Sequence, residues 1–269
     1  YYVKKFKKDF KVFVNKSRGI EKLSQIVLKI SKLNNFKKEK VFFINQYKKE
    51  YFKGLCELTK YNLFPARWGG GPPMKKLCKI ASKKKIKVLL GGDGVDEYFC
   101  GYNTFEKILK SRNKNKKNNL HQIISIKNVS GIQKKFYNPI FKSRRKILKK
   151  ISFIKNKNEK NLIINSLLDI EFFLQSCTLP HSDEYSMMES IELRSPFLDL
   201  DLVKFCLNLP LKYKVNKINK FINKYLFRRL AIRNYGKFIN KEKEGTRNFS
   251  RFISNKEFYN FEKFTILKK

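Results

Sequence analysis

A glycine-rich turn follows a short apolar run near the middle of the chain and is the segment best suited to chemistry. It contains Gly91, Gly92 and Gly94. Glycine lets a backbone approach a phosphate closely, and the N–H groups at the start of a following helix favour an anion. The spacing therefore predicts a turn that can contact a phosphorylated ligand.

Three carboxylates, Asp93, Asp96 and Glu97, occupy the same turn. Carboxylates repel phosphate unless a cation lies between them, so the turn is suited to presenting Mg²⁺ to a polyphosphate or to positioning an amine. In the alternative interpretation, Asp93 and Asp96 only cap the next helix and interact with its dipole. The residues by themselves leave both interpretations open.

The elements around the turn predict how it is held. A helix over about 74–84, with Pro73 at its first position, precedes an apolar strand over 86–90, and a new helical pattern starts near Val95. A helix, a buried strand, a glycine turn and a second helix in this order are typical of an α/β domain with a parallel sheet. Ligands bind beyond the carboxyl ends of such strands, where 91–96 would lie.

The rest of the chain predicts further helices, each with one apolar face, and one more strand. Residues 111–160 are rich in Lys and Asn and predict loop and solvated helices, Pro180 predicts a break, and Asp199 predicts a helix cap before a stop at Pro210. Helices are expected over 20–33, 47–58 and 162–173, and a strand over 41–44.

The amino-acid composition excludes several classes of protein for this chain. The chain has 269 residues, 42% of them hydrophobic, which excludes general disorder. Its net charge of +40 favours nucleic acid as a partner, but the cations are mostly Lys, whereas base recognition favours Arg, so we expect no such partner. No signal peptide or membrane span is visible. Five cysteines without a C-x-x-C pair, and two histidines, predict neither disulfides nor zinc, but buried thiols in a cytoplasmic protein.

Two segments resemble a known family. Gly91 to Tyr102 resembles the S-G-E-G-x-D-E-x-F-x-G-Y segment in the synthetase domain of glutamine-dependent asparagine synthetases. Asp183 to Asp199 resembles the family's D-R-x-S-M-x-x-S-x-E-x-R-x-P-F-L-D, and residues 202–214 resemble its continuation, L-V-x-F followed by L-P and K. Two long motifs in the right order make the resemblance specific.

The resemblance implies a fold and an activity. The fold would be an adenine nucleotide alpha hydrolase-like parallel sheet flanked by helices, with a helical C-terminal part. The family adenylates aspartate with ATP and Mg²⁺, and ammonia released from glutamine in a separate N-terminal domain attacks the β-aspartyl-AMP. The products are asparagine, AMP and pyrophosphate. The resemblance also implies a cytoplasmic enzyme and leaves a homodimer open.

The resemblance assigns roles to individual residues. Asp93 stands where the family has a glutamate that supports formation or capture of the adenylate, and Lys243 resembles a lysine that neutralises charge growing on the α-phosphate. Asp96 would help to hold magnesium pyrophosphate. The expected ATP contacts are Gly91, Gly92, Gly94 and Val14.

Two further residues of the first motif have less definite roles. The Tyr102 hydroxyl would face the substrate, or its ring would pack under the turn, which we favour. Glu97 is a further candidate to face the substrate. In the second motif, Glu192 and Arg194 would share a face and form a buried ion pair.

The sequence also departs from the family pattern. Asp93 is one methylene shorter than the usual glutamate, and no S-G-G-x-D-S-S pyrophosphate loop occurs in the 269 residues. The residues around Val14 resemble the strand after that loop. We therefore expect residues 1–269 to be a synthetase domain truncated at its N-terminus, with the glutaminase domain upstream, and to be catalytically incomplete alone. The alternatives are a related amidotransferase for another carboxylate, a basic nucleic-acid-binding protein and an inactive fragment.

Overall fold

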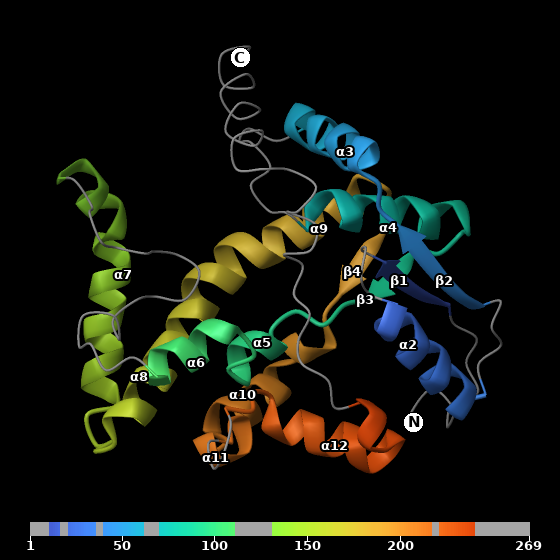
Figure 1. The fold of residues 1–269 in the computed structure, drawn as a ribbon. Helices are drawn as coiled ribbons and strands as arrows, with labels where there is room; N and C mark the ends of the chain where they lie inside the picture. Colours follow the sequence, from blue (N-terminus) through green and yellow to red (C-terminus); the bar gives the residue numbers. More distant parts are fainter. Residues whose placement is uncertain are drawn as a thin grey trace. The chain divides into compact units, whose positions relative to one another are not determined.

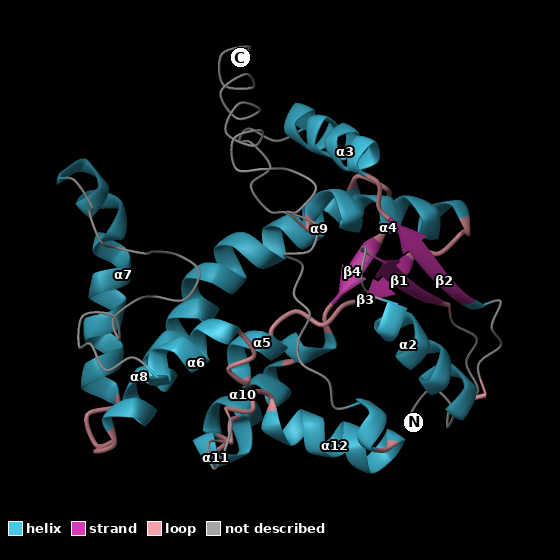
Figure 2. Ribbon diagram, in the orientation of Figure 1, coloured by secondary structure: helices cyan, strands magenta, loops and turns pink. Residues whose placement is uncertain are grey.

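The computed structural model describes residues 11–16, 21–35, 40–61, 70–110, 131–216 and 221–239 (Figure 1). These belong to two compact units that are considered separately below. Unit 1 comprises Tyr1–Leu89, His181–Leu193 and Ala231–Lys269, and unit 2 comprises Leu90–Pro180 and Arg194–Leu230. Helices make up most of the described residues, and the strands are short (Figure 2).

Unit 1 contains a parallel strand pair joined by a helix. Strand β1 (Val12–Lys16) pairs with β2 (Val41–Asn45), and α2 (Glu21–Leu33) lies between them in the chain. The register runs from Val12 opposite Val41 to Lys16 opposite Asn45. The predicted helix over 20–33 and strand over 41–44 are therefore confirmed, with their ends shifted by one residue.

Helices α3 (Lys48–Tyr61) and α4 (Gly71–Lys83) pack closely in unit 1. A Cβ on Gly54 would press against Pro72, and one on Gly71 would press against the Tyr185 ring, so both glycines permit close approach. Helix α4 begins three residues before the predicted start because two prolines fit its first turn, where backbone N–H groups have no partner within the helix.

The core of unit 1 is built from aromatic and aliphatic side chains of these helices. Tyr51, Leu55 and Leu58 of α3 are buried together with Tyr185. Beside them, the Lys75 ammonium of α4 forms ion pairs with Glu57 at 2.6 Å and Glu189 at 3.1 Å. The ion pairs connect α4 to α3 and to the segment after Met187.

Two further strands, β3 (Val88–Leu90) and β4 (Glu192–Arg194), form a second pair. The Glu192 N–H donates to the Lys87 carbonyl, and the Gly91 N–H donates to the Arg194 carbonyl, both at 2.8 Å. The bonded residues advance in the same direction along both strands, as in a parallel pair. The α/β class with parallel strands is confirmed, whereas the larger hydrolase-like sheet stays a prediction, because the described strands form two separate pairs. The prediction that the strand before the turn is buried is wrong, because Val88 and Leu90 of β3 are exposed.

Both charged residues of β4 are exposed. Glu192 and Arg194 lie on one face of the strand, as the alternation predicted. The prediction that this pair is buried is wrong, because this face is open to solvent.

Unit 2 is mostly helical. Its first part contains α5 (Val95–Tyr98), α6 (Asn103–Lys110), α7 (Gly131–Lys150), α8 (Lys157–Leu168) and the π-helix η3 (Asp169–Thr178), which continues into α9 (Leu179–Met187). Its later part contains η4 (Pro196–Leu198), α10 (Leu200–Asn208), α11 (Leu211–Lys214) and most of α12 (Tyr225–Tyr235), which is followed by η5 (Lys237–Ile239). The helical C-terminal part is thus present as far as residue 239.

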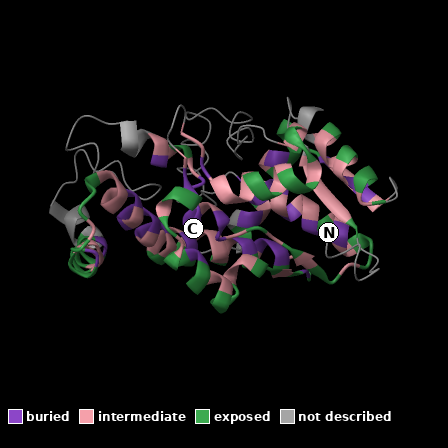
Figure 3. Ribbon diagram, turned by 90° about the horizontal axis from the view of Figure 1, so that it is seen from below, coloured by how far each residue is buried: buried purple, intermediate pink, exposed green. Residues whose placement is uncertain are grey.

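The Lys- and Asn-rich region contributes to the core of unit 2. Ile140 of α7 and Ile151 are buried against Ile164 and Leu168 of α8. Residues 111–130 lie outside the described residues. The expectation of solvated helices therefore holds for the exposed faces, while a few apolar residues in this region are buried (Figure 3).

The predicted break at Pro180 is wrong, because one helix runs from Lys157 to Met187. Pro180 lies in the first turn of α9, directly after the π-helical turns of η3. A proline inside an α-helix removes a hydrogen bond and clashes with the carbonyl four residues earlier. The wider π spacing before Pro180 accommodates this conflict without ending the helix.

The same helix is long and apolar enough, by length and composition alone, to cross a membrane. Its most apolar window has a mean hydropathy of 1.3 and is 39% buried. This is weak evidence for a span, because the core helix of a soluble protein passes the same test. Leu162, Leu168 and Leu174 of this helix are buried in unit 2, as expected of a core helix.

All five cysteines are free thiols. Cys78, Cys100 and Cys206 are buried and Cys177 is half-buried, whereas Cys56 is exposed on α3, so the expectation of buried thiols is wrong for that residue.

Candidate functional site

The turn that carries the three carboxylates, residues 91–101, is called the acidic turn below. It follows the carboxyl end of β3, as predicted. Each of its glycines has a different surrounding. The Gly91 N–H is used in the pairing with β4. Gly92 is exposed, with open space where a Cβ would point. Gly94 has a φ of +96° and is buried against Leu198 and Tyr98, so a side chain there would be both strained and crowded. Of the three, Gly92 offers a backbone that a ligand can approach.

Asp93 connects the two sequence motifs. The Ser195 hydroxyl donates to Asp93 Oδ2 at 3.2 Å. Asp93 lies three residues after β3, and Ser195 directly follows β4. The contact arises because neighbouring parallel strands place their carboxyl ends together. The position of the helix N-cap is taken by Gly94, so neither Asp93 nor Asp96 occupies it.

Asp96 is held by a lysine from far along the chain. Lys224 Nζ lies 2.8 Å from Asp96 Oδ1, and each side chain is about three-quarters buried. The Lys224 N–H also donates to the Phe99 carbonyl at 3.1 Å. A Cβ on Gly101 would overlap both the Asp96 carboxylate and the Lys224 side chain. The ammonium therefore neutralises part of the negative charge of the turn.

Two neighbours of Lys224 fix the end of the turn. Asn223 Nδ2 donates to the Gly101 carbonyl at 2.8 Å. Arg228 donates to the Asn223 carbonyl and to its Oδ1, both at 2.9 Å. The segment before α12 thus binds the backbone of the turn and orients the lysine.

Glu97 and Tyr102 lie beneath the turn. Glu97 is 1% exposed, and its Oε1 accepts a hydrogen bond of 2.6 Å from the Tyr102 hydroxyl. The Ser166 hydroxyl donates to the Glu97 carbonyl at 2.6 Å, and the Tyr102 ring packs edge-on against Phe173. Burial, together with the nearby Glu97 charge, raises the pKa of Tyr102. This arrangement agrees with the favoured packing role of the Tyr102 ring.

A second buried carboxylate lies close to Glu97. Asp169, at the start of η3, is buried, and burial raises its pKa well above the usual range, with a further contribution from the Glu97 charge. The turn therefore sits on a buried cluster of acids and hydroxyls.

Two further predicted site residues are Val14 and Lys243. Val14 is a half-buried residue of β1 in unit 1, opposite Phe43, whereas the turn belongs to unit 2. Lys243 lies outside the described residues. Within the described residues, no group of three His, Cys, Asp or Glu side chains could hold a metal ion.

Sequence reasoning missed several residues that hold the turn. Ser195 lies within the second motif, and its position after a strand paired with β3 could have indicated it. Lys224 carries no such signal in a chain with 62 Lys and Arg residues. Asp169 and Arg228 likewise become visible only in three dimensions.

Comparisons with known proteins show which family the chain belongs to. The family model named asparagine synthase matches residues 70–248, which include α4, the acidic turn and Lys224. A curated protein of Methanocaldococcus jannaschii, "Putative asparagine synthetase (glutamine-hydrolyzing) 1", is 24% identical over 187 residues, or 70% of this chain and 26% of the relative. The chain spans about a quarter of the length of that relative. With its family match covering more than half of its residues, the chain belongs to the asparagine synthase family.

Proposed function

We propose that this chain is part of an ATP-dependent amide-forming ligase that adenylates aspartate and transfers ammonia, released from glutamine, to give asparagine, AMP and pyrophosphate. The observation that carries the proposal is the contact of Asp93 with Ser195 at the ends of two parallel strands, inside the region that matches the family. Related ligases for other carboxylates share this architecture, so the acceptor is what the experiment must identify.

The two steps require groups that balance charge. An aspartate carboxylate oxygen attacks the α-phosphorus of ATP and pyrophosphate leaves; ammonia then attacks the activated carbonyl and AMP leaves. We propose that Asp93 orients the incoming amine by its negative charge. Lys243 would stabilise the charge that grows on the α-phosphate, because a cation there acts more strongly on the transition state than on the ground state.

The three glycines proposed to bind ATP would act in different ways. Gly92 has open space beside its backbone and would approach the phosphates directly. Gly91 and Gly94 would shape the turn, since one is engaged with β4 and the other is buried in a left-handed conformation. Val14 remains the proposed contact for adenine.

Asp96 is the proposed magnesium ligand. Mg²⁺ is commonly bound through one or two carboxylates, several waters and the phosphates of the substrate, so Asp96 could hold such an ion without further protein ligands. When bound, the ion would neutralise phosphate charge. Lys224 holds Asp96 in place and limits repulsion between the turn and a polyphosphate.

Glu97 and Tyr102 are proposed to position the turn. Both were candidates to face the substrate, but Glu97 is buried and its carboxylate accepts the Tyr102 hydroxyl. Their contribution would be to hold α5 against the long helix.

The wider organisation is also part of the proposal. Residues 1–269 would form a synthetase domain with the adenine nucleotide alpha hydrolase-like sheet, in a cytoplasmic enzyme whose glutaminase domain lies upstream. A homodimer is compatible with this arrangement.

The test measures pyrophosphate released from ATP with aspartate and either glutamine or ammonium, in the protein that carries this domain. Asp93→Asn should reduce aspartate-dependent release by about a hundredfold or more, because the charge at a position sensitive to displacements near 1 Å is lost. The matched control is Asp201→Asn, which changes a 93%-exposed side chain on α10. Release at the parental rate from Asp93→Asn would refute the assigned role, and activity only with another carboxylic acid in a panel would change the acceptor.

A further inference from the structure

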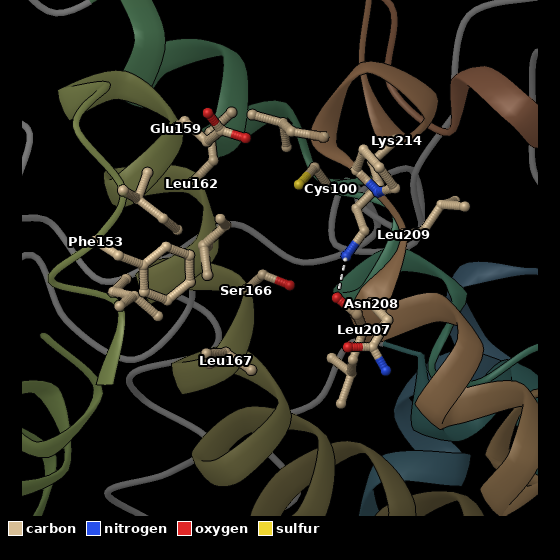
Figure 4. Close-up of a pocket in the computed structure, with 15 residues that line it drawn as sticks. Cys100, Phe153, Glu159, Leu162, Ser166, Leu167, Leu207, Asn208, Leu209 and Lys214 are labelled. Carbon is tan, nitrogen blue, oxygen red and sulfur yellow. Dashed lines mark hydrogen bonds between the residues drawn. The ribbon is translucent and has the colours of Figure 1, made fainter. Parts of the chain in front are cut away.

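Unit 2 contains a cavity of about 410 Å³ that the proposed reaction does not use. Its walls come from α8, the loop before α8, the end of α10, and α11 (Figure 4). The volume falls in the range of about 300–1,000 Å³ that is typical of small-molecule sites.

Most of the wall is apolar. The side chains that would contact a hydrocarbon are Phe153, Leu162, Ile163, Leu167, Leu207 and Leu209. Phe153 is 77% exposed, so this aromatic ring lies where the cavity meets solvent. Such a wall favours an extended apolar group that is removed from water on binding.

One cation breaks this apolar lining. Lys214 is 93% buried, and its Nζ points into the enclosed space (Figure 4). Among the described residues, its one hydrogen bond is a long one of 3.5 Å to the Leu207 carbonyl, and no carboxylate forms an ion pair with it. Burial lowers the pKa of Lys214, although Cys100 and Cys206 act in the opposite direction. An ammonium with unused donors in an apolar wall is costly unless an anion joins it.

Two other polar side chains of the wall, Ser166 and Glu159, do not compete with an anionic ligand for the Lys214 ammonium. The Ser166 hydroxyl is already used by the Glu97 carbonyl. Glu159 lines the cavity from α8, on the opposite side from Lys214 in Figure 4. The charge of Lys214 therefore favours an anionic group beside it, and the apolar side chains of the wall favour a hydrocarbon remainder.

We propose that this cavity binds an amphipathic monocarboxylate, such as a medium-chain fatty acid, with its carboxylate on Lys214 and its alkyl chain against the leucines and isoleucines of the wall. The cavity touches the back of the acidic turn through Cys100, which closes the turn, and through Ser166. The site is distinct from the one proposed for ATP and aspartate. The experiment on this cavity therefore does not depend on the proposed ligase function.

The experiment is calorimetric titration of the 269-residue chain with decanoate, octanoate and decanol in 0.3 M NaCl, which screens the exposed lysines. We expect decanoate to bind at least tenfold more tightly than decanol. It should also bind about 15-fold more tightly than octanoate, since each buried methylene contributes about fourfold. Equal affinities for decanoate and octanoate would overturn the proposal, because they would show that no alkyl chain is buried.

Two variants separate the cavity from the basic surface. Lys214→Met keeps the apolar stem and removes the buried ammonium, so the fold should be kept, and the preference for decanoate over decanol should disappear. Lys204→Met removes an exposed lysine on α10 and should leave the preference unchanged. If Lys214→Met retains the preference, or if Lys204→Met loses it equally, the carboxylate binds elsewhere and the proposal is wrong. Leu167→Trp, which fills the cavity, should weaken decanoate and decanol alike.

Discussion

At the scale of single residues, the ion pair between Asp96 and Lys224 determines which residue can follow Cys100. Both side chains pass so close to Gly101 that no Cβ fits there. Cys100 and Lys224 themselves have positive φ angles of 51° and 50°, a conformation that costs free energy in residues other than glycine. The acidic turn is thus held in a strained form by contacts from one distant segment.

Replacing Gly101 by Ala tests this arrangement. We expect the free energy of unfolding to fall by about 2 kcal/mol, since the added methyl group forces Asp96 and Lys224 apart in a packed region. Urea denaturation followed by circular dichroism gives the value. Gly92→Ala is the matched control, because a Cβ there meets open space, and it should change stability by less than about 0.5 kcal/mol. Equal effects of the two substitutions would contradict the close approach.

The buried acid Asp169 predicts a dependence of stability on pH. Its pKa is raised in the folded protein, so the folded state keeps a proton that the unfolded chain releases above about pH 4. The folded state therefore loses stability as the pH rises toward the folded pKa, by up to about 1.4 kcal/mol per pH unit.

Asp169→Asn removes this proton equilibrium. The difference in the free energy of unfolding between the variant and the parent should shift in favour of the variant as the pH is raised from 4.5 to 7.5, as measured by urea titrations. Asp201→Asn, on an exposed face, is the matched control. A constant difference across this range would mean that Asp169 ionises as readily in the folded protein as in the unfolded chain.

At the scale of elements, α4 is tied to its neighbours by one mostly buried lysine. Burial acts to lower the pKa of Lys75, but the hydrogen bonds to Glu57 and Glu189 outweigh it, and the pKa is raised. Glu189 is largely buried, whereas Glu57 is one-third exposed and better solvated. Loss of the ammonium would leave Glu189 in particular without a compensating charge.

Lys75→Met should lower the free energy of unfolding by about 1–3 kcal/mol, less than for a fully buried pair because Glu57 remains hydrated. Denaturant titration measures the loss. Adding Glu189→Gln should recover part of it, as expected when a double mutant removes an uncompensated charge. Lys79→Met, an exposed change on the same helix, provides the control, and a loss as large as that of Lys75→Met would contradict the role of the ion pairs.

Local patterns predicted the elements well where one face of an element is apolar. The helix over 21–33 and the strand over 41–45 follow directly from that spacing, and Asp199 caps α10 through the N–H groups of Asp201 and Leu202, as its position predicted. The break predicted at Pro180 is absent, because proline is compatible with a helix when a π-helical segment precedes it. The acidic turn was identified from its glycines and carboxylates, but its supports were not, since Lys224 and Asp169 contact it only through tertiary folding.

At the scale of the whole molecule, the abundance of both lysine and aromatic residues has a common structural use. The Lys84 ammonium lies 4.1 Å from the centroid of the Phe42 ring, and Lys29 lies 4.2 Å from that of Phe238. Such contacts let a long side chain cover an aromatic ring while its charge stays in water. Part of the net charge of +40 therefore shields apolar surface.

The contacts that hold the acidic turn also bear on how the protein is made. Asp93 and Ser195 are 102 residues apart, and Gly101 and Asn223 are 122 residues apart. Ribosomes add about 5–20 residues per second, so at least about 6 s separate the synthesis of Gly101 from that of Asn223. During this interval the nascent chain carries the carboxylates of the turn without their lysine. Closing such long loops is slow, so we expect the turn to be among the last parts of the domain to reach its native form.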